Sequence, residues 1–151
     1  MADRFFDSSA IAKHYRIEKG TAKVDAFLFE GGSRHFISSL SVVELHSAFA
    51  RLVRTGQITQ GDFHLARARF LADIAAGLWQ IVPVTDAHFH RAQDLLVQHG
   101  PLHPLRTLDA IQLAVAHLNP PVPFKAFVCA DVNLCQIASA EGLTVVNPEV
   151  P

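Results

Sequence analysis

Two aspartates stand where a parallel β-sheet could use them for chemistry. Asp7 follows an apolar strand predicted at residues 5–6 and comes directly before a predicted helix. Asp131 repeats this arrangement after residues 127–129. In open α/β sheets, ligands bind beyond the carboxyl ends of the strands, where helix N-termini present partial positive charge. Both carboxylates are therefore candidate site residues, although either could serve only as a helix N-cap.

Glu44 is expected at the same edge of the sheet. It lies in the first turn of the helix predicted after the second strand, residues 35–38. Right-handed crossover connections would bring it to the edge that holds Asp7. Its alternative role is to close a capping box with Ser41, three residues earlier.

Asp109 lies in a surprisingly apolar environment for an acid. The helix predicted over residues 105–118 is almost wholly apolar and is expected to be buried. A bare carboxylate there costs several kcal/mol unless it is paired. Pairing with Arg106, one helical turn earlier, is the structural alternative to a functional role.

Carboxylates that converge on one cleft repel one another unless a cation supplies the opposite charge. Oxygen ligands without cysteine or histidine partners favour Mg²⁺ or Mn²⁺. Such an ion, held by few protein ligands, activates water and stabilises charge on a phosphodiester. The candidates to hold such an ion are Asp7, Glu44, Asp109 and Asp131, each of which keeps the structural alternative given above.

The elements that must position these acids alternate along the chain. Strands are predicted at residues 5–6, 35–38, 78–82, 127–129 and 144–146. Helices are predicted at residues 8–18, 21–30, 41–54, 59–76, 85–98, 105–118 and 131–140. This alternation predicts a three-layer α/β/α fold with a five-stranded, mostly parallel sheet and the first strand at its centre. With 151 residues, half of them hydrophobic, we expect a single domain over residues 1–151.

Composition narrows the class of protein. The 13 basic and 14 acidic residues leave the chain near neutrality. A polyanionic substrate would therefore have to bind to a local group of basic side chains. Cys129 and Cys135 are six residues apart, outside metal-binding and redox spacings, and are expected as reduced core residues. No apolar run approaches the roughly 18 residues that a membrane span needs. We expect a cytoplasmic protein without a membrane partner.

Nine histidines suggest a metal site, above all at His88, His90, His99 and His103. Positions two apart on a helix diverge by about 200°, so His88 and His90 cannot share one ion from a regular helix. We expect these histidines on the surface.

At this point the chain resembles a known family. The motif D-S-S-A at residues 7–10 is followed in order by S-x-x-E-L at 41–45, L-R-T-L-D-A-I-Q-L-A at 105–114 and A-D at 130–131. Together they resemble a PIN domain of the VapC-type toxin branch over nearly the whole chain. The resemblance implies a PIN-like α/β fold and a Mg²⁺- or Mn²⁺-dependent endoribonuclease with the four acids as ligands. Ser9 matches the small hydroxyl residue that accompanies the first aspartate.

The resemblance also implies partners. These are an RNA substrate, a cognate antitoxin and a second copy of the chain in a homodimer, for which the helices over residues 42–74 could supply an apolar surface. Arg16 and Arg106 are the candidates for RNA contacts, because each lies near the active end of a predicted ligand helix. Arg51 and Arg54 are expected on a solvated helix face.

Three other functions fit parts of the pattern. A phosphatase with Asp7 as nucleophile would need a second aspartate where Ser9 stands. A receiver-like phosphoacceptor domain would need a lysine at the end of the last strand, and residues 144–147 contain none. A binding module without catalysis, whose acids are all helix caps, remains the third alternative.

Overall fold

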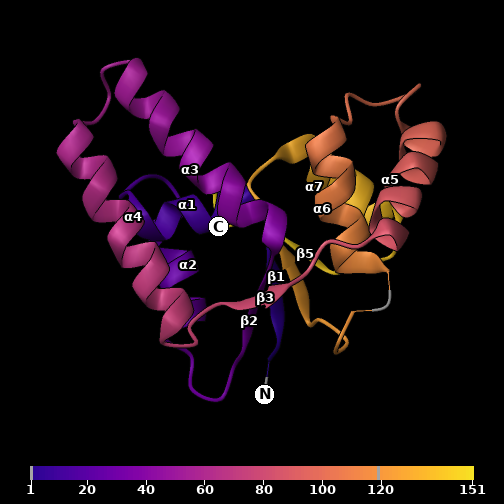
Figure 1. Ribbon diagram of the computed structural model, residues 1–151. Coiled ribbons are helices and arrows are strands. Elements are labelled where there is room, and N and C mark those ends of the chain that lie inside the picture. The colour runs from indigo at the N-terminus through magenta and orange to yellow at the C-terminus, as the bar shows by residue number, and fades with distance from the viewer. Residues whose placement is uncertain (1, 119) are drawn as a thin grey trace.

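The computed structural model describes residues 2–118 and 120–151, which form a five-stranded sheet covered by helices (Figure 1). The strands are β1 (Arg4–Phe6), β2 (His35–Ser38), β3 (Gln80–Val82), β4 (Ala126–Val128) and β5 (Val145–Val146). Their order is β3-β2-β1-β4-β5, and the four described pairings are parallel. The predicted sheet with its first strand at the centre is confirmed.

Helices cover both faces of this sheet. They are α1 (Ser8–Tyr15), α2 (Thr21–Leu28), α3 (Ser39–Arg54), α4 (Gln60–Ala75), α5 (Asp86–His99), α6 (Thr107–His117) and α7 (Val132–Ala140). Figure 1 shows α1 to α4 on one side of the strands and α5 to α7 on the other. Two buried apolar clusters fill the two spaces between helices and sheet. The predicted three-layer α/β/α architecture is therefore confirmed.

The central strand β1 is apolar on both faces. Phe5 packs in the layer of α5 to α7 and stacks on Phe127 with ring centroids 5.9 Å apart. Phe6 packs in the opposite layer and meets Trp79 edge-on at 5.3 Å. A strand covered on both faces has no polar alternation, as the sequence indicated. This packing fixes the position of Asp7, the residue that follows the strand.

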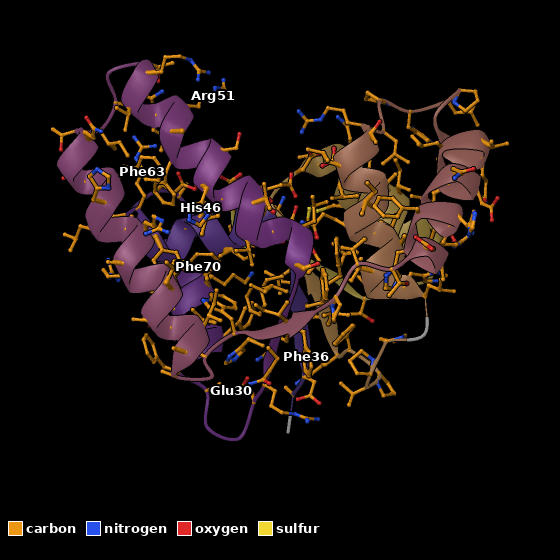
Figure 2. All side chains as sticks on the ribbon, in the orientation of Figure 1. Glu30, Phe36, His46, Arg51, Phe63 and Phe70 are labelled. Atoms are coloured by element: carbon orange, nitrogen blue, oxygen red, sulfur yellow. The ribbon has the colours of Figure 1, made fainter. Side chains whose placement is uncertain are left out.

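Helices α3 and α4 form an antiparallel pair (Figure 1). Their contact includes a stack of Phe49 on Phe63 at 6.3 Å and an edge-on contact of His46 with Phe70 at 6.4 Å. Figure 2 shows His46, Phe63 and Phe70 between the two helices, and Arg51 near the end of α3 that is far from the sheet. These aromatic contacts hold the two helices together.

The first helix is shorter than predicted. Helix α1 ends at Tyr15 rather than near residue 18, because the Thr21 hydroxyl donates to the carbonyl oxygen of Lys13 at 2.8 Å and so satisfies the end of the helix. Gly20 has a φ of 93° and is the N-cap of α2. Only glycine adopts this left-handed conformation at little cost.

The predicted capping box of Ser41 and Glu44 is wrong. Strand β2 passes into α3 without a loop, so the last extended residue is Ser38, and its hydroxyl accepts a hydrogen bond from the Ser41 backbone N–H at 3.1 Å. The cap thus lies three residues earlier than expected. Glu44 is left free to bond elsewhere.

The predicted helix over residues 105–118 is found as α6, and it is buried over most of its length as expected. Its predicted stop at residues 119–121 includes Asn119, which lies outside the described residues. Across residues 2–118 and 120–151, no helix has both the length and the apolar character needed to traverse a bilayer.

Three of the predicted surface histidines are buried, namely His35, His88 and His99. His88 Nδ1 accepts the Thr85 backbone N–H at 3.0 Å, and His99 Nε2 lies 2.6 Å from a carboxylate oxygen of Glu141. The prediction fails there because these hydrogen bonds replace the water that each ring loses. His90 and His103 are exposed, as predicted.

Candidate functional site

Asp7 is buried at the carboxyl end of β1, with 4% of its surface exposed. Its Oδ1 accepts hydrogen bonds from the Ser9 hydroxyl at 2.6 Å and from the Ala10 backbone N–H at 3.2 Å. Burial raises the pKa of Asp7 to about 7, although both hydrogen bonds favour the charged form. Asp7 is thus an N-cap, but its buried setting also marks it as a candidate functional group.

The end of β4 is tied to Asp7. Because β1 and β4 pair in register, the residues after each strand meet. The Ala130 backbone N–H donates to Ser9 Oγ at 3.0 Å, and the Cys129 thiol donates to Asp7 Oδ2 at 3.4 Å. Asp131 then caps α7 by accepting the Leu134 backbone N–H at 3.1 Å. Cys129 and Cys135 are free thiols, the first buried and the second half-buried.

Arg106 joins two of the predicted ligands. Its Nε lies 3.2 Å from Asp109 Oδ2 and its Nη2 lies 3.7 Å from Asp131 Oδ2. The alternative pairing of Asp109 with Arg106 is therefore present. The Arg106 side chain is 78% exposed, and ion pairs with so exposed a partner are worth at most about 1 kcal/mol.

Electrostatics link Asp109 to Asp7. Burial raises the pKa of Asp109, and the Arg106 guanidinium partly offsets this effect. The negative charge of Asp109 in turn contributes to the raised pKa of Asp7. The two carboxylates therefore lie within range of each other's charge.

Glu44 is held by hydrogen bonds from two other helices. Its Oε1 accepts the Ser8 hydroxyl at 2.9 Å and Gln112 Nε2 at 2.7 Å. Gln112 also donates to Ser41 Oγ at 2.7 Å and accepts from the Ser38 hydroxyl at 2.8 Å. Glu44 thus reaches from α3 to the first residue of α1 and to the middle of α6.

The four acids fit a hard divalent cation by donor type, since all offer carboxylate oxygens. The guanidinium against Asp109 and Asp131 shows that these carboxylates already attract a positive charge. In the described part of the chain, no three acidic, histidine or cysteine side chains converge closely enough to hold an ion as they stand. Coordination by all four acids stays a prediction.

A groove of about 470 Å³ opens beside Ser9 and Asp131. Arg16 and Arg51 line it, and Arg16 Nη1 lies 3.9 Å from a carboxylate oxygen of Glu18. A larger hollow of about 730 Å³ lies beside α7 and β5, but its lining contains no acid. The smaller groove is therefore the one of the two that borders predicted site residues, Ser9 and Asp131.

Gln112 and Ser38 were missed by the sequence reasoning. The signal for Gln112 was present, because it is the one uncharged polar side chain between Asp109 and residue 116 of an apolar helix. A buried amide needs hydrogen-bond partners, so its presence there could have predicted a polar contact. No local signal pointed to Glu44 as that partner.

Several solved structures have a similar fold. FitAcB from Neisseria gonorrhoeae matches with a TM-score of 0.68 and 17% identity, over 98% of this chain and 99% of that chain. VapC20 from Mycobacterium tuberculosis, a toxin that cleaves the sarcin–ricin loop, matches with a TM-score of 0.68 and 18% identity, over 96% and 99%. A toxin–antitoxin complex from Klebsiella pneumoniae matches with a TM-score of 0.61 and 16% identity, over 96% and 97%.

These TM-scores establish a shared fold. No curated protein matches the chain significantly by sequence. The family model of the PIN domain, however, matches residues 4–119, from β1 to just beyond α6. That span covers most of the chain and includes three of the four acids. The resemblance inferred from the motifs is thereby confirmed, and the chain belongs to the PIN-domain family.

Proposed function

We propose that this chain, acting as a single PIN-like domain over residues 1–151, is a metal-dependent endoribonuclease that hydrolyses RNA phosphodiesters. The observation that carries the proposal is Asp7, a buried carboxylate at the carboxyl end of the central strand whose pKa is raised to about 7. Burying such a group is unfavourable unless a cation compensates it. Membership of the PIN-domain family supports the same chemistry.

In this proposal Asp7, Glu44, Asp109 and Asp131 hold Mg²⁺ or Mn²⁺. When bound, the ion supplies positive charge that activates water and stabilises the transition state at the phosphodiester. The catalytic role of the four acids is to position that charge, so the chemistry requires no nucleophilic side chain.

Neighbouring residues prepare this arrangement. Ser9 orients the Asp7 carboxylate and ties it to the end of β4. Arg106 is exposed enough to turn from Asp109 and Asp131 toward a substrate phosphate. Its guanidinium could then form bidentate hydrogen bonds to a phosphate.

The proposal predicts RNA cleavage that depends on a divalent cation. Purified protein is incubated with structured RNAs in Mg²⁺ or Mn²⁺, and EDTA is expected to abolish cleavage because carboxylates alone cannot stabilise the charge on the phosphate. Readdition of Mn²⁺ after EDTA controls for damage to the protein. Equal cleavage with and without the chelator would contradict the metal requirement.

A binding module without catalysis is the second candidate, because Asp7 and Asp131 both serve as N-caps. A receiver-like module has no comparable observation in its favour. Calorimetric titration with Mn²⁺ distinguishes the two candidates. Acids that only cap helices should give no specific Mn²⁺ binding. The nuclease should bind Mn²⁺, and Asp109→Asn should weaken that binding. Asp86, exposed at the start of α5, provides the matched control Asp86→Asn.

RNA is proposed to follow the groove beside Asp131, with Arg16 and Arg51 as phosphate contacts. We expect Arg51→Ala to weaken binding of single-stranded RNA several-fold. Each lost phosphate contact reduces the magnitude of the slope of log K against log[salt] by about 0.7 for a single strand. Binding measured at several salt concentrations tests this.

Arg54→Ala is the matched control, because Arg54 lies on the same helix and does not line the groove. If both variants change the salt dependence equally, net charge and not the groove determines RNA binding.

We further propose that the chain is the toxin of a type II toxin–antitoxin pair, acting in the cytoplasm as a homodimer neutralised by an antitoxin. Support comes from the similar folds of a toxin–antitoxin complex from Klebsiella pneumoniae and of the toxin VapC20. Exposed apolar side chains on the pair α3 and α4, including Val43 and Leu65, are candidate contacts. A monomer in light scattering, with no small protein co-purifying from the native operon, would contradict the toxin proposal and leave the nuclease proposal standing.

A further inference from the structure

We infer that Gln112 is a positioning residue that sets the orientation of the Glu44 carboxylate in the active site. This inference rests on the proposed function, because it assigns a role toward the bound cation. It concerns a side chain that the four-acid pattern does not contain. Gln112 lies in α6, three residues after Asp109, and is only 2% exposed.

The hydrogen bonds leave the Gln112 amide one consistent orientation. A carboxylate only accepts hydrogen bonds, so the amide nitrogen must face Glu44, at 2.7 Å from Oε1. The amide oxygen then faces the Ser38 hydroxyl, which donates to it at 2.8 Å. Ser38 is itself fixed as the N-cap of α3. The amide group that donates to Glu44 is therefore held in its orientation by Ser38, which caps the helix that carries Glu44.

Glu44 is consequently held on one oxygen. Its Oε1 accepts from both Gln112 and the Ser8 hydroxyl, the latter at 2.9 Å. Within residues 2–118 and 120–151, its Oε2 has no hydrogen-bond partner among the side chains and backbone groups. One oxygen is thus anchored while the other remains available to a cation.

Gln112 also couples the elements that carry the acids. Its side chain joins α6, which bears Asp109, to α3, which bears Glu44, and its Nε2 lies 3.0 Å from Ser8 Oγ, directly after Asp7. An apolar residue of similar size would fill this core position without needing partners. The polar network is therefore better explained by the placement of Glu44 than by packing alone.

The test compares divalent-cation affinity in the full chain and its variants by calorimetric titration with Mn²⁺. Replacing an outer hydrogen-bond partner of a metal ligand typically costs 10–100-fold in metal affinity. We expect Gln112→Met, which preserves side-chain volume, to weaken Mn²⁺ binding about 10-fold while the stoichiometry stays unchanged. Gln112→Asn retains the amide but shortens its reach, and serves if the methionine variant does not fold.

Val115→Ala is the matched control, because it removes buried apolar atoms from the same helix without touching the network. It should lower the unfolding temperature and leave the Mn²⁺ affinity unchanged. Ser8→Ala, which removes the other donor to Glu44 Oε1, should weaken Mn²⁺ binding in the same direction as Gln112→Met.

The outcomes separate the two proposals. If the parent binds no Mn²⁺, the metal-dependent function fails. If the parent binds Mn²⁺ and a folded Gln112 variant binds it equally tightly, the positioning role is wrong while the function survives. If Val115→Ala loses as much affinity as Gln112→Met, general destabilisation accounts for the effect and the positioning role is again wrong.

Discussion

Replacing Asp7 by asparagine is expected to lower the rate of RNA cleavage by about three orders of magnitude. A cation in such a site is worth several kcal/mol of transition-state stabilisation, and each 1.4 kcal/mol corresponds to about tenfold in rate. Asparagine has the shape of aspartate and still caps a helix, so it removes the charge and keeps the cap. Single-turnover cleavage of a labelled RNA at saturating Mn²⁺ measures the effect.

The matched control for this prediction is Asp86→Asn, which removes one negative charge from an exposed position on α5. It should cleave at the parental rate. If Asp7→Asn also cleaves as fast as the parent, Asp7 is only an N-cap and the proposed mechanism is wrong.

The same substitution is expected to make the metal-free protein more stable at pH 8. The pKa of Asp7 is about 7 in the folded chain, against 3.8 for an ordinary aspartate. A raised folded-state pKa means that the folded form binds the extra proton, so Asp7 makes folding less favourable as pH rises from about 4 through 7. The difference of about three pKa units corresponds to an upper value of about 4 kcal/mol.

Urea unfolding of parent and Asp7→Asn in the presence of EDTA, between pH 4 and pH 8, tests this. The two proteins should have similar free energies of unfolding at pH 4. As pH rises, the free energy of unfolding of the variant should exceed that of the parent by an increasing amount. Other groups titrate in both proteins, so only the difference is interpreted. A difference that does not change with pH would show that the folded pKa of Asp7 is ordinary. Mg²⁺ at pH 8 should stabilise the parent and not the variant.

Local patterns were enough to place the acids on the right elements. The apolar strand before Asp7 and its repeat before Asp131 are neighbours in the sheet, as their shared pattern indicated. Periodicity located the helices because it reports which face of each helix is buried. The helix ends were less well predicted, since Thr21 and Ser38 act as caps through contacts that periodicity does not encode.

The tertiary structure decided which partner each acid has. The order of motifs predicted a PIN-domain protein, but not that Gln112 donates to Glu44 from 68 residues away. Likewise, the buried His99 has as its partner Glu141, the residue that follows α7. Arg106 was foreseen as a local partner of Asp109, whereas its reach to Asp131 was not.

The physical reason lies in the range of the two kinds of signal. Apolar spacing and capping residues act within one or two turns of a helix or one strand, so they can be read from neighbouring residues. The hydrogen bonds that orient Glu44 and the burial that raises the pKa of Asp7 arise only when separate elements pack together. They depend on distances between segments that no local pattern contains.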